Sequence, residues 1–177
     1  VWRKGTDRLE AIAHELVRRR PGTRTVWVGG REGRSGPPEP GPPVEVWPTT
    51  PRPWGILAGV DLMVVPSRED PLPLVALEAG LHGRALIAAP TGGLPALLDD
   101  GRGVVVDGHD LLGWVDRTVD LLDDPAARDA MGQALRTHVL QGRLTQRGGV
   151  RVHRVSWSVA DLLGLERPDE DCLMTAL

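Results

Sequence analysis

The sequence predicts an α/β fold, with an open parallel sheet that helices cover on both faces. Short apolar runs recur along residues 25–106 and alternate with segments of helical spacing, an order typical of parallel sheets. The run Leu62–Val65 is apolar throughout, as expected of a strand that is covered on both sides. Ligands of such sheets bind beyond the carboxyl ends of the strands, so the turns after the strands are where a site is expected.

The individual elements follow from spacing and from turn residues. Residues 6–20 carry apolar side chains at helical spacing, with Thr6 or Asp7 as the cap and Pro21-Gly22 as the end. Strands are expected at Thr25–Val28, Val44–Trp47, Leu62–Val65, Ala85–Ala89 and Val104–Val106. Further helices are expected at Ile56–Val60, Leu74–Leu81, Leu94–Leu98, Asp110–Leu122 and Pro125–Leu140.

The remaining segments are less regular. Residues 31–43 read as a Gly/Pro-rich loop, residues 141–149 as a Gly/Arg-rich break, and Val155–Leu163 as a last structured segment. We therefore expect one domain over residues 1–165 and a disordered tail over residues 166–177.

Composition limits the classes of function. The chain has 177 residues, a net charge of −3, a single cysteine, Cys172, and a single lysine, Lys4. The charge provides no basic field for nucleic acid, and neither a disulfide framework nor metal-ligand spacing is present. No apolar run reaches the roughly 18–20 residues of a membrane span, and the N-terminus lacks a signal core. We expect a cytoplasmic protein without a metal, from a GC-rich, bacterial-type genome.

A helix start after the third strand is suited to binding phosphate. Pro73 fits the first position of this helix, and the amide groups of Leu74 and Val75 then point out of its positive end. Glu78 shares the face of these two residues, where a carboxylate is placed to accept hydrogen bonds from a diol such as a ribose. The alternative interpretation is that Glu78 is a solvated acid.

Two acidic residues, Glu69 and Asp70, precede this helix. Asp70 is placed to meet hydroxyl groups of a second moiety that lies beyond the phosphates. The alternative is that both residues are helix-terminal charges, which the dipole favours.

Two further turns carry candidate residues. Arg3 and Lys4 stand before the first helix, where two cations are suited to a diphosphate, although a solvated charge pair is equally ordinary there. Gly92 and Gly93 let the backbone approach a ligand closely, with Thr91 as a cap of the short helix that follows. The alternative for the glycines is a tight turn that requires positive φ.

Together these segments resemble the donor-binding, C-terminal half of retaining glycosyltransferases with the GT-B fold, most nearly family 4, also called group 1. The motifs that carry the resemblance are Lys4-Gly5, Val28-Gly29-Gly30, Pro66-Ser67, Asp70 to Glu78-Ala79, Gly83 to Ala88, Gly92-Gly93, Gly101–Asp110 and Asp123-Asp124-Pro125. The resemblance covers residues 1–163. It implies a Rossmann-like nucleotide-sugar-binding domain, with the N-terminal acceptor domain of these enzymes missing from the chain.

The resemblance also implies roles for the candidate residues. Asp70 takes the catalytic position and contacts the donor sugar, Lys4 contacts the diphosphate, Glu78 the ribose and Thr50 the base. Together with the candidates from the turns, the predicted substrate-binding set is Lys4, Arg3, Glu69, Leu74, Val75, Glu78, Gly92, Gly93 and Thr50. No cofactor is implied, and the expected partners are a nucleotide-sugar donor, an unidentified acceptor and the missing N-terminal domain.

Departures from the family pattern keep other functions open. Asp70 stands where the family has Glu, Pro73 where it has Gly, Ala85 where it has Pro, and Ala96 where it has Glu. Pro73 thereby removes one N–H donor. The alternatives are a non-catalytic nucleotide-binding or partner-docking module, half of a sugar-nucleotide epimerase or phosphorylase, and an assembly role in which residues 141–177 dock a partner.

Overall fold

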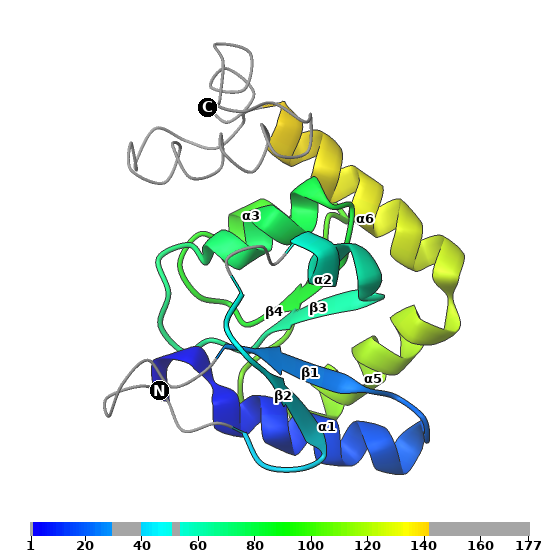
Figure 1. Ribbon diagram of the computed structural model, residues 1–177. Helices are drawn as coiled ribbons and strands as arrows, with labels where there is room; N and C mark the ends of the chain where they lie inside the picture. Colours follow the sequence, from blue (N-terminus) through cyan, green and yellow to red (C-terminus); the bar gives the residue numbers. More distant parts are fainter. Residues whose placement is uncertain (1, 30–39, 51–53, 142–177) are drawn as a thin grey trace.

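The computed structural model describes residues 2–29, 40–50 and 54–141, and Figure 1 shows how their elements are arranged. The helical elements are η1 (Trp2–Lys4, a 3-10 turn), α1 (Thr6–Arg19), α2 (Trp54–Gly59), α3 (Leu74–Leu81), α4 (Leu94–Leu98), α5 (Leu111–Asp123) and α6 (Pro125–Leu140). The strands are β1 (Thr25–Val28), β2 (Val44–Trp47), β3 (Leu62–Val65), β4 (Ala85–Ala88) and β5 (Val104–Val105).

All the strand pairs are parallel. β1 pairs with β2, while β3, β4 and β5 form a second ladder in that order. The registers start with Thr25 opposite Val44 and with Leu62 opposite Ala85. Parallel neighbours need a crossover connection, and α3 and α4 supply those from β3 to β4 and from β4 to β5. The predicted α/β fold with parallel strands is confirmed.

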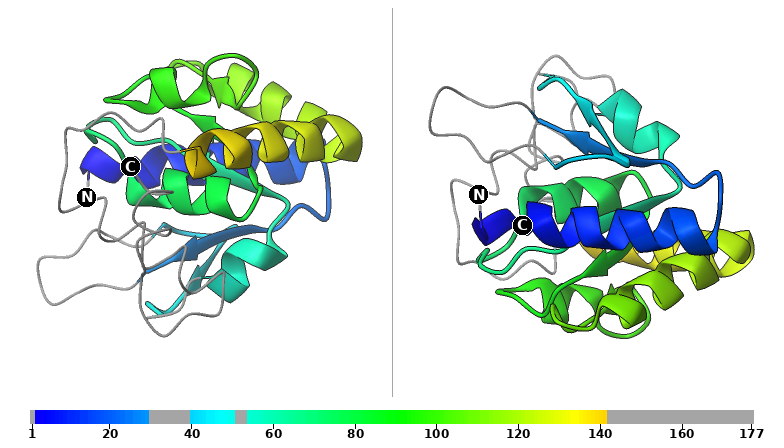
Figure 2. Two further views of the ribbon diagram at one scale, coloured as in Figure 1. Left: turned by 90° about the horizontal axis from the view of Figure 1, so that it is seen from above. Right: turned by 90° about the horizontal axis from the view of Figure 1, so that it is seen from below.

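Helices lie on both sides of the strands, as the two views of Figure 2 show. On one side, Ile12 of α1 and Trp114 of α5 share a core with Ile87 of β4. α1 also reaches β2, because Leu9 packs with Val44. α1 therefore contributes to the packing of both ladders.

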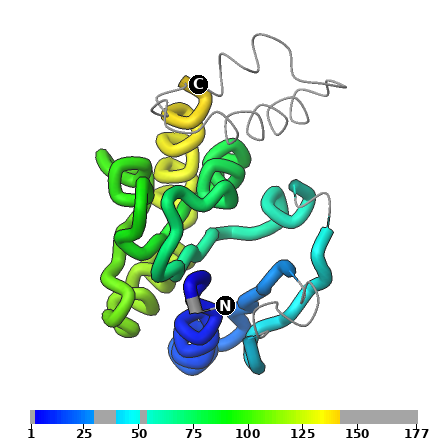
Figure 3. The backbone as a smooth tube through the Cα atoms, turned by 90° about the vertical axis from the view of Figure 1, so that its left-hand side faces the viewer, coloured from blue at the N-terminus to red at the C-terminus, as the bar shows by residue number. Residues whose placement is uncertain are grey.

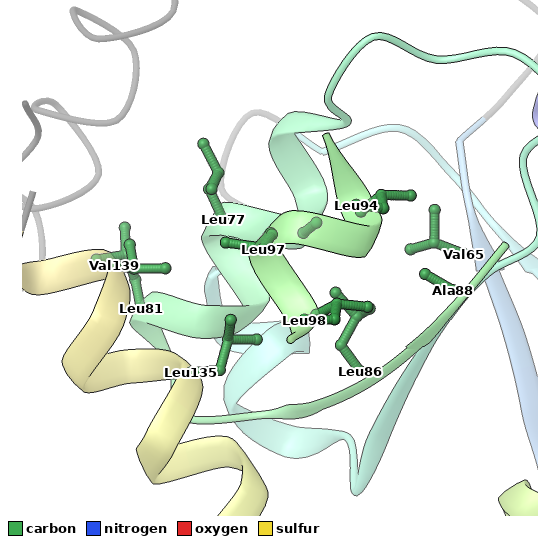
Figure 4. Packing of buried hydrophobic residues seen from close by; sticks show 11 residues of the cluster. Val65, Leu77, Leu81, Leu86, Ala88, Leu94, Leu97, Leu98, Leu135 and Val139 are labelled. Carbon is green, nitrogen blue, oxygen red and sulfur yellow. The ribbon is translucent and has the colours of Figure 1, made fainter. Parts of the chain in front are cut away.

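α3, α4 and α6 cover the opposite side (Figure 4). The buried residues of this cluster are Val65, Ala76, Leu77, Leu81, Leu86, Ala88, Leu94, Leu97, Leu98, Leu135 and Val139. α6 approaches so closely that a Cβ atom on Gly132 would lie 2.0 Å from the carbonyl oxygen of Gly83. Because this close packing involves backbone atoms, α6 belongs to the same core as the strands.

The predicted elements are confirmed, with small shifts at their ends. α2 begins at Trp54 and not at Ile56, and β5 ends before Val106, although the side chain of Val106 is buried. Residues 31–39 of the loop predicted at residues 31–43, and every prediction for residues 142–177, lie outside the described residues.

The predicted cap of α1 is wrong, and the reason is tertiary. Neither Thr6 nor Asp7 caps the helix; Gly5 is the N-cap, with φ 70° and no side-chain hydrogen bond. A Cβ atom at this position would lie 2.2 Å from the carbonyl oxygen of Pro66. Only glycine permits both the left-handed backbone and this close approach, so the contact with Pro66 requires glycine at the position before α1.

Candidate functional site

The candidate residues gather where β3 ends and α3 begins. The connecting loop, Pro66–Pro73, contains the buried Ser67 near its start. The N-terminal turn η1 lies beside this loop (Figure 3), and the carbonyl oxygen of Arg3 accepts hydrogen bonds from the amides of Arg68 at 2.8 Å and Glu69 at 3.3 Å. The structure thus joins two segments that are far apart in the sequence.

Lys4 and Asp70 make the central contact of the site. The Nζ atom of Lys4 donates a hydrogen bond to Oδ2 of Asp70 at 2.5 Å. The side chain of Lys4 is 54% exposed, whereas that of Asp70 is only 9% exposed. An ammonium group has three donors, so Lys4 compensates the nearly buried carboxylate and still presents donors to solvent.

Arg3 and Glu69 lie next to this pair on the solvent side. The Nε atom of Arg3 and Oε2 of Glu69 are 3.6 Å apart, and both side chains are more than half exposed. Such an exposed pair contributes little to stability. Both side chains are therefore accessible to a ligand at small energetic cost.

α3 begins without a side-chain cap. Pro73 is the N-cap, with φ −64° and ψ 125°, and not the first helical residue as predicted, because its ψ is extended although its φ suits a helix. Its carbonyl oxygen accepts the amide of Ala76 at 3.0 Å. The first amides of a helix have no intrahelical acceptor, so those of Leu74 and Val75 have no acceptor within α3 itself. Glu78 lies one turn further along and is half-buried.

The Gly92-Gly93 turn after β4 contacts the loop Pro66–Pro73, which we call the acidic loop. The amide of Gly93 donates a hydrogen bond to the carbonyl oxygen of Pro71 at 2.7 Å. Gly92 has φ 54°, and a Cβ atom there would lie 2.1 Å from the carbonyl oxygens of both Asp70 and Pro71. The turn therefore packs on the loop that carries Asp70, while a direct contact of the two glycines with a donor stays a prediction.

Thr91 has a different role from the predicted one. The N-cap of α4 is Gly93, and no side chain caps this helix. Instead, the hydroxyl of Thr91 accepts the amide of Asp70 and donates to the carbonyl oxygen of Arg68, both at 3.3 Å. The prediction that Thr91 caps α4 is wrong because its hydroxyl turns toward a loop from another part of the chain.

An ion pair between Arg68 and Asp7 ties the acidic loop to α1, and the sequence analysis missed it. Nη1 and Nη2 of Arg68 donate to Oδ1 and Oδ2 of Asp7 at 2.7 and 2.6 Å. The hydrogen bond from Arg68 lowers the pKa of Asp7 below its ordinary value. No local pattern marks this pair, because its two residues are 61 positions apart.

The remaining candidate, Thr50, lies after β2 and is half-buried, and residues 51–53 that follow it are outside the described residues. Its assignment to the base of the donor stays a prediction. A hollow of about 550 Å³ lies elsewhere, along β5 and α5. Its lining residues are Arg19, Val105, Val106, Asp107, Asp110, Gly113, Asp116, Arg117, Val119 and Asp120. The candidate site is therefore distinct from this hollow.

The described part of the chain offers neither a metal site nor a membrane-spanning helix. Among these residues, no group of three or more His, Cys, Asp or Glu side chains is placed to hold a metal ion. Within the same residues, no helix has the length and apolar character needed to cross a membrane.

Comparison of the fold with solved structures defines the class of protein. The fold is similar to that of sucrose-phosphate synthase from Thermosynechococcus elongatus, with a TM-score of 0.67 and 26% identity over 76% of this chain and 37% of that chain. It is also similar to HepE from Anabaena, solved in complex with UDP-glucose, with a TM-score of 0.62 and 19% identity over 76% of this chain and 40% of that chain. The parallel strands and their helices are thus those of a GT-B glycosyltransferase domain.

The sequence assigns the chain to one family within this class. The family described as "Glycosyl transferases group 1" matches residues 1–124, and the chain belongs to this family. A relative named D-inositol 3-phosphate glycosyltransferase, from Corynebacterium aurimucosum, is 35% identical over an alignment of 160 residues, and the match covers 78% of this chain and 36% of that protein. The chain spans about a third of the length of this relative and matches the C-terminal half of its homologues.

A second family matches the other end of the chain. The family described as "Magnesium chelatase, subunit ChlI C-terminal" matches residues 119–177, of which the structure describes residues 119–141. This stretch contains α6, which packs on α3 in the core described above.

Proposed function

We propose that this chain is the donor-binding domain of a retaining, family 4 glycosyltransferase, which transfers a sugar from a nucleotide-diphosphate sugar to an acceptor. Family membership, the GT-B fold and the match to the C-terminal half of the homologues support the proposal. HepE, a protein of similar fold, is solved with UDP-glucose, which agrees with a nucleotide-sugar donor. The acceptor is left unassigned, because the chain spans only part of its relatives.

The observation that carries the proposal is the placement of Lys4 and Asp70 at the open start of α3. Lys4 donates to Asp70 at 2.5 Å and remains 54% exposed, so its further donors are available to the oxygens of a diphosphate. The amides of Leu74 and Val75 lie at the positive end of the helix dipole, which favours phosphate. These groups together would stabilise the leaving diphosphate as its charge develops, and the proposal requires no cofactor.

The other donor contacts follow from the same arrangement. Asp70 comes directly before Pro71, on the loop that leads into α3, and we assign its carboxylate to the donor sugar. Glu78 is half-buried one turn into the helix, and we assign its two oxygens to the hydroxyls of the ribose. The Asp70 carboxylate reaches less far than the Glu of the family, so recognition of the sugar depends on how closely the loop holds it.

The test of the proposal is nucleotide binding that depends on Glu78. UDP and GDP are titrated by calorimetry into the wild-type chain and into Glu78→Gln. Losing a charged contact to the ribose should cost about 1.5–3 kcal/mol, or roughly ten- to a hundredfold in affinity. Glu15→Gln is the matched control, because Glu15 lies on α1 and pairs with Arg18 of the same helix. Equal affinities of wild type and Glu78→Gln for the bound nucleotide would contradict the assignment.

A second candidate function is a module that binds nucleotides without catalysing transfer. The specific observation in its favour is that Lys4 and Asp70 satisfy one another, with the carboxylate 9% exposed. Release of a nucleoside diphosphate from a sugar nucleotide by this chain, abolished in Asp70→Asn, would exclude that candidate. Binding of sugar nucleotides without any release, also after the N-terminal half of a family member is fused to this chain, would support it.

We further propose that one domain continues through α6. The two family matches meet at residues 119–124, but Leu135 and Val139 of α6 are fully buried in the cluster with α3. A domain boundary near residue 124 would expose both side chains. Limited proteolysis with trypsin should therefore spare Arg117 and Arg128, which flank the junction, and rapid cleavage at either would contradict a domain that includes α6.

A further inference from the structure

We propose that the Arg68–Asp7 ion pair is a positioning element of the donor site, which sets the contact between Lys4 and Asp70. The inference rests on the proposed donor-binding function. Neither residue of the pair belongs to the predicted donor contacts, yet each is close in sequence to one of them. Asp7 follows Lys4 on the N-terminal side of the site, and Arg68 precedes Asp70 on the acidic loop.

Arg68 is held through its backbone and through its side chain. Its amide donates to the carbonyl oxygen of Arg3 at 2.8 Å, and its carbonyl oxygen accepts the hydroxyl of Thr91 at 3.3 Å. Its guanidinium makes the two parallel hydrogen bonds to Asp7, a geometry that fixes direction as well as distance. Arg68 therefore connects the N-terminal turn, the acidic loop and the Gly-Gly turn in a single residue.

The two side chains of the pair differ in exposure. The side chain of Arg68 is 16% exposed, whereas that of Asp7 is 63% exposed. Removing the Asp7 carboxylate would take away both of these charge-assisted hydrogen bonds, and the direction of the Arg68 side chain would no longer be fixed by them. The acidic loop would move with Arg68, because the backbone of the loop follows that side chain.

The other contacts of the loop hold its start and its Asp70 end separately. Nη1 of Arg8 donates to the carbonyl oxygen of Pro66 at 3.3 Å, and Gly5 packs on the same oxygen. These contacts hold the end of β3, which lies before the loop turns toward Asp70. The part of the loop that carries the acid is held by Arg68 and Thr91, by the amide of Glu69 on the carbonyl oxygen of Arg3, and by the amide of Gly93 on the carbonyl oxygen of Pro71.

The single lysine of the chain provides a direct measurement of this effect. Protein labelled with 13C at the lysine ε-carbon has one side-chain signal, that of Lys4. Asp70→Asn defines the signal of Lys4 without its carboxylate partner. We expect the signal in Arg68→Ala and Asp7→Asn to move from the wild-type position toward the Asp70→Asn position, and the double variant to move no further than either single variant.

Arg24→Ala is the matched control for a lost Arg–carboxylate pair. Nε and Nη2 of Arg24 donate to Glu45 at 2.7 and 2.8 Å; Arg24 directly precedes β1 and Glu45 lies in β2, whereas the acidic loop follows β3. The Lys4 signal should stay at its wild-type position in Arg24→Ala. Asp7→Asn keeps the size of an exposed side chain, so it tests the proposal even where Arg68→Ala lowers the amount of folded protein.

Binding of UDP separates this inference from the function on which it rests. We expect Arg68→Ala and Asp7→Asn to lower the affinity for UDP about three- to tenfold, and Arg24→Ala to leave it unchanged. A wild-type chain that binds neither UDP nor GDP contradicts the proposed function, while the Lys4 signal still decides whether the pair positions Lys4 and Asp70. A Lys4 signal that moves in Asp70→Asn but stays unchanged in Arg68→Ala and Asp7→Asn overturns the inference, whatever the nucleotide affinity.

Discussion

The replacement of Gly92 by alanine tests whether the close packing of the Gly-Gly turn fixes the position of the acidic loop. Gly92 has φ 54°, where a side chain costs about 1–2 kcal/mol. Its Cβ atom would in addition meet two backbone carbonyl oxygens, those of Asp70 and Pro71, at 2.1 Å. Neither oxygen belongs to a flexible side chain, so the loop itself would have to shift.

Gly101 provides the matched control. It also has positive φ, 75°, but a Cβ atom there would meet nothing within 4 Å. Gly101→Ala therefore has the backbone cost alone, about 1–2 kcal/mol, whereas Gly92→Ala adds an overpacking cost of about 1–3 kcal/mol. Gly92→Ala should thus destabilise the protein by about 2–5 kcal/mol in total, on the same principles.

Urea unfolding of the two variants and the wild type measures both costs on one scale. The affinity for UDP is then measured at a temperature where all three proteins are folded. We expect Gly92→Ala to lose affinity, because the displaced loop carries Asp70, and Gly101→Ala to keep it. Equal losses of unfolding free energy in the two variants would refute the reasoning, since they would mean that a Cβ atom at Gly92 meets no steric resistance from the loop.

Three further predictions concern charge, pH and catalysis. Lys4→Ala should lower the affinity for UDP more than the affinity for uridine, by up to about fivefold if the contact contributes the 0.2–1 kcal/mol of an exposed ion pair. The difference should shrink with added salt. An equal loss of affinity for UDP and for uridine would argue against a diphosphate contact. Burial, together with the charges of Arg84 and Arg136, lowers the pKa of His82. As the pH falls, the unfolded chain therefore binds a proton at His82 before the folded chain does, and the free energy of unfolding should decrease below the ordinary His pKa of about 6.5. In His82→Gln this decrease should be smaller. An identical pH dependence of stability in both proteins would exclude a contribution from His82. Finally, the chain of residues 1–177 should unfold cooperatively but should not reach acceptor-dependent turnover in the range of about 1–10³ per second, because transfer requires groups on both sides of a cleft; nucleoside diphosphate release with and without acceptors decides this.

The order of the elements was predictable because it depends on neighbouring residues. Apolar spacing and turn residues place the strands and most of the helix ends close to where the structure has them. The same local signals placed Glu78 on the first turns of α3. Their positions in turns made Lys4 and Asp70 candidates, the resemblance to group 1 glycosyltransferases gave them roles, and the family match confirms that resemblance.

The errors of the sequence analysis occur where two distant segments meet. Gly5 caps α1 because the carbonyl oxygen of Pro66 lies 2.2 Å from where a Cβ atom would be. Thr91 bonds to the acidic loop and leaves α4 without a side-chain cap. Local preferences favour Thr6 and Thr91 as caps, but a close tertiary neighbour overrides them at both positions.

The sequence by itself determined which elements form, the family to which the chain belongs and which charged residues are available at the carboxyl end of β3. Only the tertiary structure decided how those residues pair. Lys4 meets Asp70 across 66 positions and Asp7 meets Arg68 across 61, and neither separation follows from a helical or strand repeat. Helix and strand periods arise from the backbone of each segment alone, whereas these ion pairs exist only because packing of α1 against the strands brings its first turn to the loop after β3.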